Sequence, residues 1–228
     1  MKHTATLEDA NHSLDEAVST LQNHLSKVDQ NEPEQLKLAN EYYKWTTLKT
    51  NLILNEKSFQ IPPTALPNII KPSSFKWLRP EKQAVVSKYY RYDKETDTYV
   101  ISVKKQSVPC EDIEMIARSL VPIRKAVVWV DFGYNIGTEF GGRHPAIILK
   151  NLKDSLIVIP LSSQEPKSMD YNVKVDKVYG YPLMPRWVNV TRITQVSLSR
   201  VHFEKIGDVK PCILNQISEK LKNCGIII

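Results

Sequence analysis

The sequence predicts an α+β protein, in which an N-terminal helical hairpin precedes a C-terminal β-barrel that ends in a helix. Three observations predict this order: two amphipathic helical segments, a proline-rich stretch, and a run of short strands after Lys125. We therefore expect three parts: a helical hairpin over residues 1–57, a connector over residues 58–122 and a barrel domain over residues 123–228.

Residues 6–30 carry a seven-residue apolar repeat that is typical of an amphipathic helix. The repeat consists of Leu7, Leu14, Leu21 and Val28. Pro33 suits the first turn of a second helix, which we expect to run to about Glu56. Two helices alone bury little apolar surface, so the hairpin is expected to pack on a partner copy or on the rest of the chain.

The middle of the chain, residues 58–122, is predicted to be an extended connector followed by a β-hairpin and a short helix. Its first part disfavours a regular helix because it contains five prolines between residues 58 and 80. It also carries apolar side chains such as Leu66 and Ile70, so we expect parts of it to lie on a surface. Residues 84–104 have two β-rich runs around a polar turn, and Glu111–Leu120 has the pattern of a helix.

Short strands separated by turns dominate the chain after Lys125. The candidate strands are Ala126–Asp131, Ala146–Lys150, Leu156–Leu161, Asn172–Val175 and Trp187–Thr191. Ile193–Leu198 either extends the last of these or starts another strand. Pro211 at a first helical turn predicts a terminal helix of about ten residues. Many short strands with one terminal helix favour a compact β-barrel of about 105 residues.

The positive charge of the chain lies entirely in its second half. The net charge is +6 and the pI is about 9.1. Residues 1–122 hold 16 Lys/Arg and 16 Asp/Glu, whereas residues 123–228 hold 15 Lys/Arg and 9 Asp/Glu. A basic domain of this kind favours a polyanionic partner, nucleic acid first and an acidic protein second.

Composition also predicts where the protein works. The cysteines are odd in number and show no CxxC spacing, so Cys110, Cys212 and Cys224 are expected to be free thiols in a reducing compartment. The N-terminus lacks the apolar core of a signal peptide, and no apolar run approaches the roughly 20 residues of a membrane span. We expect a cytoplasmic protein without a membrane partner.

A glycine-punctuated loop, Gly133–His144, separates two of the predicted strands. It gathers glycines beside charged residues, and the next strand pair ends in two hydroxyls and an amide at Ser162–Gln164. Glycines beside a charged cluster indicate a site, because they let a ligand approach the backbone closely. The alternative is a long hairpin with a solvated tip.

Three short motifs in this region resemble the PemK/MazF toxin family. They are Val130–Gly133 (VDFG), Gly137–Pro145 (GTEFGGRHP) and Leu161–Gln164 (LSSQ). The resemblance covers about residues 124–225, and residues 1–122 do not take part in it. It implies an SH3-like barrel of the PemK/MazF/CcdB type that dimerises and cleaves single-stranded RNA (mRNA) without metal. It also implies a cognate antitoxin protein as a partner.

The resemblance assigns candidate roles to residues of this sequence. The family's catalytic arginine precedes the loop proline; here that position is His144, and Arg143 lies one place earlier. The family hydroxyl falls on Ser162, where threonine is usual. The candidate catalytic residues are Arg143, His144, Ser162 and Glu139. The candidate RNA-binding residues are Gly141, Gly142, Ser163, Gln164, Arg186 and Arg192, with Arg200 as a further groove arginine. The alternative for the three arginines is a solvated face.

The side chains supply the groups that metal-free RNA cleavage needs. The reaction requires a base for the 2′-OH, charge stabilisation at phosphorus and an acid for the 5′ oxygen. His144 could serve as base or acid, and Arg143 suits bidentate phosphate contact. Glu139 could orient Arg143, act as base or form a structural salt bridge. Neighbours on a strand point to opposite faces, so Arg143 and His144 reach one phosphate together only if the loop is irregular.

Other interpretations stay open at this stage. No cofactor or metal site is predicted, because the carboxylates of the second half are scattered singly. The barrel could instead be a non-catalytic binding module, as in gyrase-poisoning toxins or a nucleic-acid-binding adaptor. The N-terminal half could dimerise the protein, recruit a partner or cover the groove. Lys71, Lys76 and Arg79 make the connector a poor mimic of RNA, so dimerisation ranks above inhibition.

Overall fold

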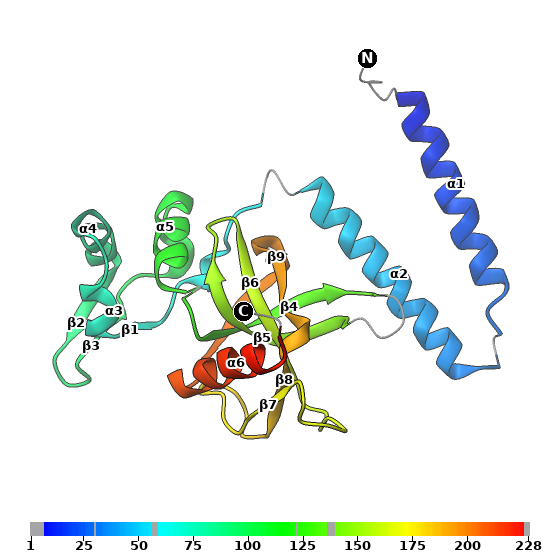
Figure 1. Cartoon of the computed structure of the whole chain (residues 1–228). Helices are drawn as coiled ribbons and strands as arrows, with labels where there is room; N and C mark the ends of the chain where they lie inside the picture. Colours follow the sequence, from blue (N-terminus) through cyan, green and yellow to red (C-terminus); the bar gives the residue numbers. More distant parts are fainter. Residues whose placement is uncertain (1–6, 30, 56–58, 122, 136–139, 226–228) are drawn as a thin grey trace, which may run out of the picture. The chain divides into compact units, whose positions relative to one another are not determined.

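The computed structural model describes residues 7–29, 31–55, 59–121, 123–135 and 140–225 and is shown in Figure 1. The chain divides into two compact units, Met1–Ile53 and Leu54–Ile228. We call them the N-terminal unit and the main unit. The chain is a mixed helix and sheet protein with helices at its N-terminal end and one helix at its C-terminal end, which confirms this part of the predicted fold class.

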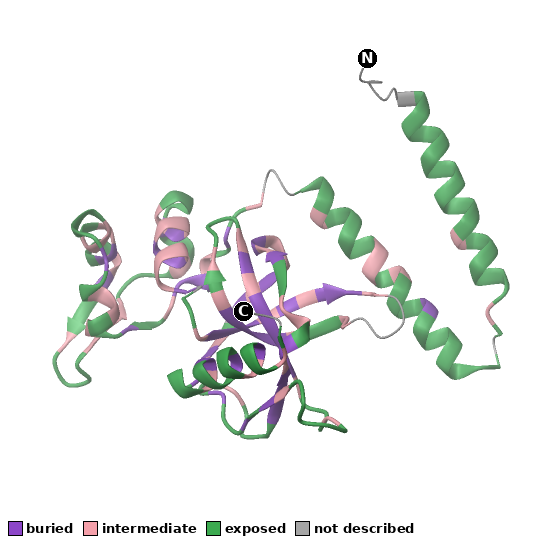
Figure 2. Ribbon diagram, in the orientation of Figure 1, coloured by how far each residue is buried: buried purple, intermediate pink, exposed green. Residues whose placement is uncertain are grey.

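The N-terminal unit carries the two predicted helices, α1 (Leu7–Ser26) and α2, which runs from Pro33 to Leu54. Tyr43 links them, because its hydroxyl donates to the Leu21 carbonyl at 3.3 Å and lies 3.1 Å from Nδ1 of His24. Most side chains of both helices are exposed, as Figure 2 shows. The expectation that this hairpin packs on a partner copy remains a prediction.

The main unit begins with short helices and a small sheet. Its elements in chain order are η2 (Pro63–Ala65), β1 (Ile69–Ile70), α3 (Pro72–Lys76), α4 (Pro80–Tyr89), β2 (Tyr90–Asp93), β3 (Thr98–Ile101), η3 (Lys105–Ser107) and α5 (Cys110–Leu120). The three strands pair in the order β1-β3-β2. The predicted helix over Glu111–Leu120 is confirmed, and α5 begins one residue earlier.

Two predictions for this region are wrong. The connector is helical at η2 and α3, because prolines occupy the first helical positions, where no backbone donor is needed. The predicted hairpin over residues 84–104 is helical up to Tyr89, and only the turn and the strands around it are confirmed. The helix replaces the predicted strand because α4 buries Val86 completely. This packing overrides the strand propensity of the valines and tyrosines in α4.

The second sheet contains seven strands. They are β4 (Ala126–Gly133), β5 (Gly142–Asn151), β6 (Ser155–Ser162), β7 (Asn172–Val175), β8 (Arg186–Asn189), β9 (Thr194–Ser197) and β10 (Val201–Asp208). Six strands follow the order β10-β4-β5-β6-β8-β7, and β9 pairs with β6. Every predicted strand is present, but β10 was not predicted. The predicted terminal helix is α6, Pro211–Asn223, which lies across the sheet near β7 and β8 (Figure 1).

The two faces of this sheet pack against different layers. One core joins Val128, Val130 and Ile148 to residues of η2, α4 and α5. The other core joins Val127 and Ile147 to β7, β8 and α6. Alternate residues of β4 and β5 therefore face opposite layers, as the two-residue period of a strand requires. Residues 59–121 therefore supply one layer of this core.

The predicted closed barrel is not shown by the strands that the structure describes. β7 and β10 lie at the two ends of the hydrogen-bonded order. An isolated bridge between Tyr179 and Asp208 joins the segment after β7 to β10, with N–H···O distances of 2.8 and 3.0 Å. One bridge brings the ends together without forming a continuous ladder between them.

Candidate nucleic-acid interface

The predicted site lies where β4 and β5 enter the glycine-rich loop. The strands pair with Val130 opposite His144 and Asp131 opposite Arg143, and the register shifts before Gly133 and Gly142. Predicted catalytic residue Glu139, with Gly137 and Thr138, lies outside the described residues. The structure therefore gives no placement for the carboxylate of the predicted set.

The glycines at the ends of the loop have a structural explanation. Gly133 and Gly142 have φ values of +98° and +80°, which L side chains rarely adopt. A Cβ on Gly141 would lie 2.6 Å from the carbonyl oxygen of Gly133. The loop is tied further by Asn135, whose Nδ2 donates to the Phe140 carbonyl at 2.6 Å. These contacts explain Gly141 and Gly142 without a ligand, so their RNA-binding role remains a prediction.

Arg143 and His144 point to opposite faces of the sheet, as the strand period requires. The His144 ring lies 4.4 Å from the Phe140 ring, whereas the Arg143 guanidinium lies 5.9 Å from the Trp129 ring centroid. We call these the His144 face and the Arg143 face. The predicted catalytic pair is thereby divided between two surfaces.

The His144 face carries a second cation beside the histidine. The Arg192 guanidinium lies 4.9 Å from the centroid of Phe140, so that one ring contacts both His144 and Arg192. A hollow of about 580 Å³ opens next to them. Phe140, Asn135, Arg192 and Arg200 line it, together with Asn189 and Gln195. The predicted RNA-binding residue Arg192 thus lies close to His144.

The environment of His144 favours its neutral form. Burial lowers the pKa of His144 below its ordinary value of 6.5, and the positive charge of Arg192 lowers it further. Hydrogen bonding to the backbone at Gly141 and Leu161 acts in the opposite direction. A neutral imidazole can accept a proton near neutral pH.

The strand register relates Ser162 to His144. Ala146 pairs with Pro160 across β5 and β6, and the same antiparallel ladder continued by two residues would set His144 opposite Ser162. Residues at even spacing share a face, so Ser162 belongs to the His144 face. Its Oγ accepts the N–H of Gln164 at 3.0 Å, and the neighbouring Ser163 and Gln164 are exposed.

The Arg143 face holds an aromatic stack flanked by cations. Trp129 stacks on Tyr181 with ring centroids 6.1 Å apart, and the charged groups of Arg186 and Lys205 lie 5.7 and 5.2 Å from the Tyr181 centroid. Burial raises the pKa of the Tyr181 phenol, so that it stays protonated. Arg186 is only 5% exposed and donates to the carbonyls of Pro182 and Met184, which gives this predicted RNA-binding residue a structural role.

One hydrogen-bonded pair on the Arg143 face was not predicted. Nε2 of His202 lies 2.6 Å from Oδ2 of Asp131, and both side chains are partly buried. Trp129 is the register partner of His202, and Arg143 is that of Asp131. The sequence carried no signal for this pair or for Tyr181, because β10 and the loop before β8 approach β4 only in the folded chain. Arg200 lines the hollow of the His144 face, and its predicted role as an RNA-groove residue remains a prediction.

Two general properties concern only the part of the chain that the structure describes. No helix there combines the length and apolar character that crossing a membrane requires. No group of three or more His, Cys, Asp or Glu side chains in the same residues is placed to hold a metal ion.

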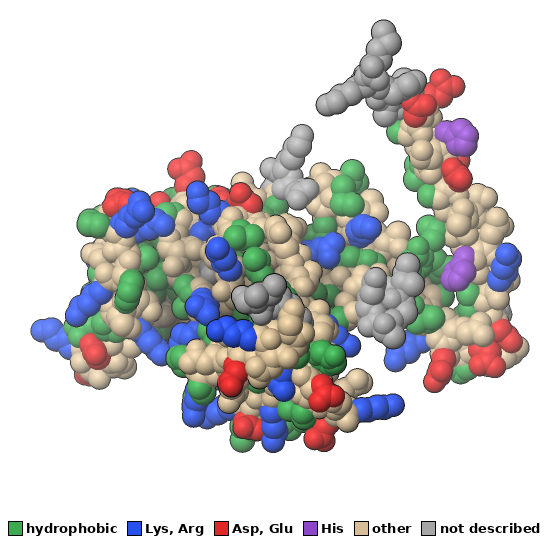
Figure 3. All heavy atoms as spheres, in the orientation of Figure 1, with side chains coloured by type: hydrophobic (Ala, Val, Ile, Leu, Met, Phe, Trp, Pro, Cys, Tyr) green, Lys and Arg blue, Asp and Glu red, His purple; other side chains and the backbone are tan. Residues whose placement is uncertain are grey.

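Lys and Arg side chains are spread among carboxylates over the visible face of the main unit (Figure 3).

The β-sheet domain, its terminal helix and the motifs at the glycine-rich loop lie in one segment of the chain, which a known family matches. Residues 123–224 match the family of PemK-like, MazF-like toxins of type II toxin–antitoxin systems. This match confirms the predicted resemblance to a PemK/MazF-family toxin over that segment of the chain. Residues 1–122 lie outside it.

Solved structures similar to this chain include several MazF proteins. MazF from Deinococcus radiodurans is 21% identical, with a TM-score of 0.40, and the similarity covers 47% of this chain and 98% of that one. The Mycobacterium tuberculosis toxin MazF-mt6 is 15% identical, with a TM-score of 0.35, and the similarity covers 44% of this chain and 97% of that one. An endoribonuclease in complex with its cognate antitoxin, from a mycobacterial species, is 17% identical, with a TM-score of 0.35 and coverages of 47% and 99%. No curated protein sequence matches this chain.

Proposed function

We propose that the chain is the toxin component of a toxin–antitoxin system and acts as a metal-independent endoribonuclease on single-stranded RNA. One observation carries the proposal: His144, with its lowered pKa, and Arg192 both contact Phe140, which lines an open hollow together with Arg192. A neutral base and a permanent cation on one face are the two groups that cleavage of a ribose-phosphate backbone needs most. The family match of residues 123–224 supports the same reaction.

In the proposed reaction, His144 removes the proton of the ribose 2′-OH, and the 2′ oxygen attacks the adjacent phosphorus. Arg192 stabilises the negative charge that develops on the phosphate oxygens, because its guanidinium stays charged throughout. Ser162 donates a hydrogen bond to a phosphate oxygen. The bond to the 5′ oxygen breaks, that oxygen takes a proton from solvent, and His144 releases the proton that it accepted to solvent. The products are a 2′,3′-cyclic phosphate and a 5′-OH.

The roles of Arg143 and of the other predicted residues follow from the two faces. Arg143 is exposed and lies over Trp129, so we assign it phosphate contact with the RNA strand and not a catalytic step. Ser163 and Gln164 are exposed at the end of β6 and are assigned to RNA contact beside Ser162. Glu139, Gly141 and Gly142 keep their predicted roles as proposals.

The remaining family properties are also part of the proposal. We infer an SH3-like barrel closed by the segment around the Tyr179–Asp208 bridge, a homodimer, a cognate antitoxin and a cytoplasmic location. Exposed apolar side chains of the N-terminal unit, such as Leu14 and Leu38, support dimerisation or partner recruitment by that unit.

The test is cleavage of RNA by the full chain in the presence of EDTA. A mixed-sequence single-stranded RNA carrying a fluorophore and a quencher reports cleavage directly. We expect cleavage by the wild type, strong loss in His144→Ala, and wild-type activity in the matched control His12→Ala, whose exposed histidine lies on α1. Uncut RNA, or cleavage only with added Mg²⁺, would overturn the proposal.

A second function is favoured by the Arg143 face. Trp129 and Tyr181, with Arg143 and Lys205 around them, form a basic aromatic surface of the type that holds single strands without cutting them. The chain would then be a non-catalytic binding module, either a nucleic-acid adaptor or a toxin of the gyrase-poison type. Tight binding of RNA or of gyrase by the full chain without any cleavage would identify this function.

A further inference from the structure

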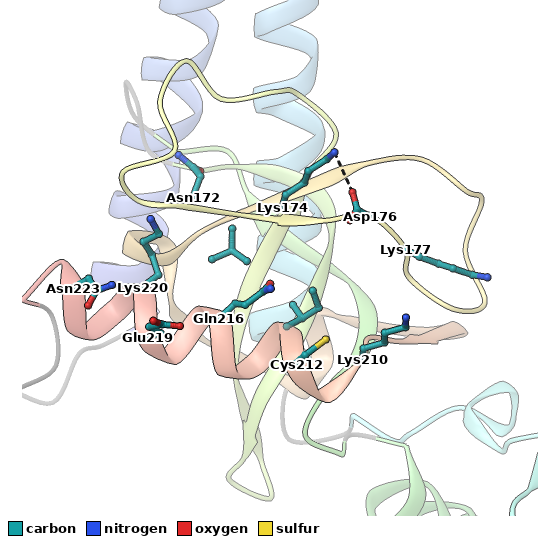
Figure 4. Close-up of a pocket in the computed structure, with 12 residues that line it drawn as sticks. Asn172, Lys174, Asp176, Lys177, Lys210, Cys212, Gln216, Glu219, Lys220 and Asn223 are labelled. Atoms are coloured by element: carbon teal, nitrogen blue, oxygen red, sulfur yellow. Dashed lines mark ion pairs between the residues drawn. The ribbon is translucent and has the colours of Figure 1, made fainter.

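The main unit contains a second open hollow, far in sequence from the glycine-rich loop. It has a volume of about 630 Å³ and lies between β7 and α6. Figure 4 shows Lys174, Asp176 and Asn172 on the β7 side and Gln216, Glu219 and Lys220 on the α6 side. We call it the β7–α6 groove.

The first feature of this groove is an unpaired strand edge. β7 is the last strand in the hydrogen-bonded order and pairs with β8 on one side, and no described strand pairs with its other side. Val173 and Val175 are buried beneath it, whereas Lys174 between them is exposed. An edge of this kind is a template for an added strand, whose backbone pairs with the free N–H and C=O groups.

The second feature is the charge of the lining. Four lysines, Lys174, Lys177, Lys210 and Lys220, face two carboxylates, Asp176 and Glu219. Lys174 is paired with Asp176 at 3.1 Å, and Lys220 donates to the Met169 carbonyl at 3.0 Å. Within the described residues, Lys210 has no acidic partner, and it flanks the first turn of α6, which holds no acidic side chain. The groove therefore has an excess of positive charge.

These two features select the occupant. A second copy of the same strand would set Lys174 near another Lys174, and like charges on facing strands are unfavourable. RNA fits less well than a polypeptide, because Asp176 and Glu219 would repel phosphates and because Val173 and Ile213 form an apolar part of the lining. The amides of Asn172 and Gln216 can bond to a peptide backbone or to carboxylates.

We propose that the β7–α6 groove binds an extended acidic segment of a partner protein. The segment pairs with the outer edge of β7. Because Lys174 lies on the face of β7 opposite to α6, carboxylates on one face of the segment meet Lys174 and those on its other face meet Lys210 and Lys220. The proposal does not rest on RNA cleavage, because none of these residues belongs to the His144 face.

The experiment uses the immobilised full chain and a phage library of randomised twelve-residue peptides. We expect the enriched peptides to carry an excess of Asp and Glu. The best of them, labelled with fluorescein, should bind the double variant Lys174→Glu/Lys210→Glu at least about tenfold more weakly, because reversed charges repel the ligand. The control Lys94→Glu, an exposed lysine in the turn between β2 and β3, should bind as the wild type does.

Two further readouts decide the mode of binding. Hydrogen exchange should show slower exchange of β7 amides when the peptide is bound. RNA cleavage by the groove variant should equal that of the wild type, which separates failure here from failure of the proposed nuclease. Enrichment of neutral or basic peptides, equal binding by the groove variant, unchanged exchange in β7, or displacement of the peptide by a twelve-nucleotide oligouridine would each overturn the proposal.

Discussion

The substitution Arg192→Ala tests whether Arg192 and His144 act as one unit. It removes a guanidinium 4.9 Å from the Phe140 ring, and Phe140 in turn contacts His144 at 4.4 Å between ring centroids. A hydrogen bond to a charged group contributes about 1.5–3 kcal/mol, so losing one phosphate contact should lower kcat/KM by about 10- to 150-fold. Cleavage of a labelled single-stranded RNA measures this loss.

The same substitution, Arg192→Ala, should also change the pH dependence of kcat/KM. Arg192 lowers the pKa of His144, so its removal should raise that pKa toward the ordinary value. A base is active when unprotonated, so the acid limb of the plot of log(kcat/KM) against pH should move to higher pH. The control Arg124→Ala, at an exposed arginine, should leave both the rate and the profile unchanged. A rate loss without any shift of the acid limb would refute the coupling, and an unchanged rate would refute the role of Arg192.

Three further predictions concern stability and binding. Ile116→Ala should lower the free energy of unfolding by about 2–5 kcal/mol in urea titrations, because this fully buried side chain joins α5 to the sheet. The control Ile123→Ala, at a 44% exposed position, should change the free energy of unfolding by less than about 0.5 kcal/mol, and equal losses would argue against the shared core. Arg143→Ala should weaken binding to oligouridine and flatten the slope of log K against log salt by about 0.7, as expected for one lost phosphate contact to a single strand, and an unchanged slope would argue against that contact. His144 has a lowered pKa when folded, so its contribution to stability is present above its ordinary pKa of 6.5 and is lost as pH falls toward the folded value. His144→Gln should therefore lose less stability than the wild type when unfolding is compared at pH 7.5 and at roughly pH 5, and equal losses would show that the histidine is not buried as described.

The sequence predicted the elements whose signals are local. The seven-residue repeat from Leu7 and the proline at position 33 were sufficient for α1 and α2. The strand β10 was missed because its register shifts between His202 and Gly207 and because Lys205 interrupts the apolar pattern. Residues 84–89 of α4 were predicted as strand from their local propensity. The helix forms instead because it buries Val86, and that burial depends on residues distant in the sequence.

The sequence predicted residues of the candidate site but not which distant residues lie beside Arg143 and which lie beside His144. The two-residue period of a strand already placed Arg143 and His144 on opposite faces, and the structure has this arrangement. Sequence spacing does not predict which distant residues contact Arg143 and which contact His144. Arg192 reaches the His144 face from the short helix η4 (Val190–Arg192), and Tyr181 reaches the Arg143 face from the loop before β8. The position of both segments depends on contacts that have no sequence period.

The connector prediction failed for a related reason. Prolines between residues 58 and 80 were interpreted as an extended connector, whereas two of them begin short helices. The expectation that parts of it lie on a surface agrees with Leu66 and Ile70, which enter the main core. Proline excludes the interior of a helix but favours its first turn, so composition alone could not separate the two cases. The consequence is practical: fragments should begin near Leu54, because a start at residue 123 removes one layer of the core.

The most direct test of the central claim is the chemistry of the RNA ends produced by the full chain in EDTA. We predict fragments with 2′,3′-cyclic phosphate and 5′-OH ends from the wild type and from His12→Ala. His144→Ala should reduce their formation by about 10²- to 10⁴-fold, as expected for loss of a general base or acid. Intact RNA, fragments with 5′-phosphate ends, or equal cleavage by His144→Ala would contradict the claim that His144 initiates attack by the 2′-OH.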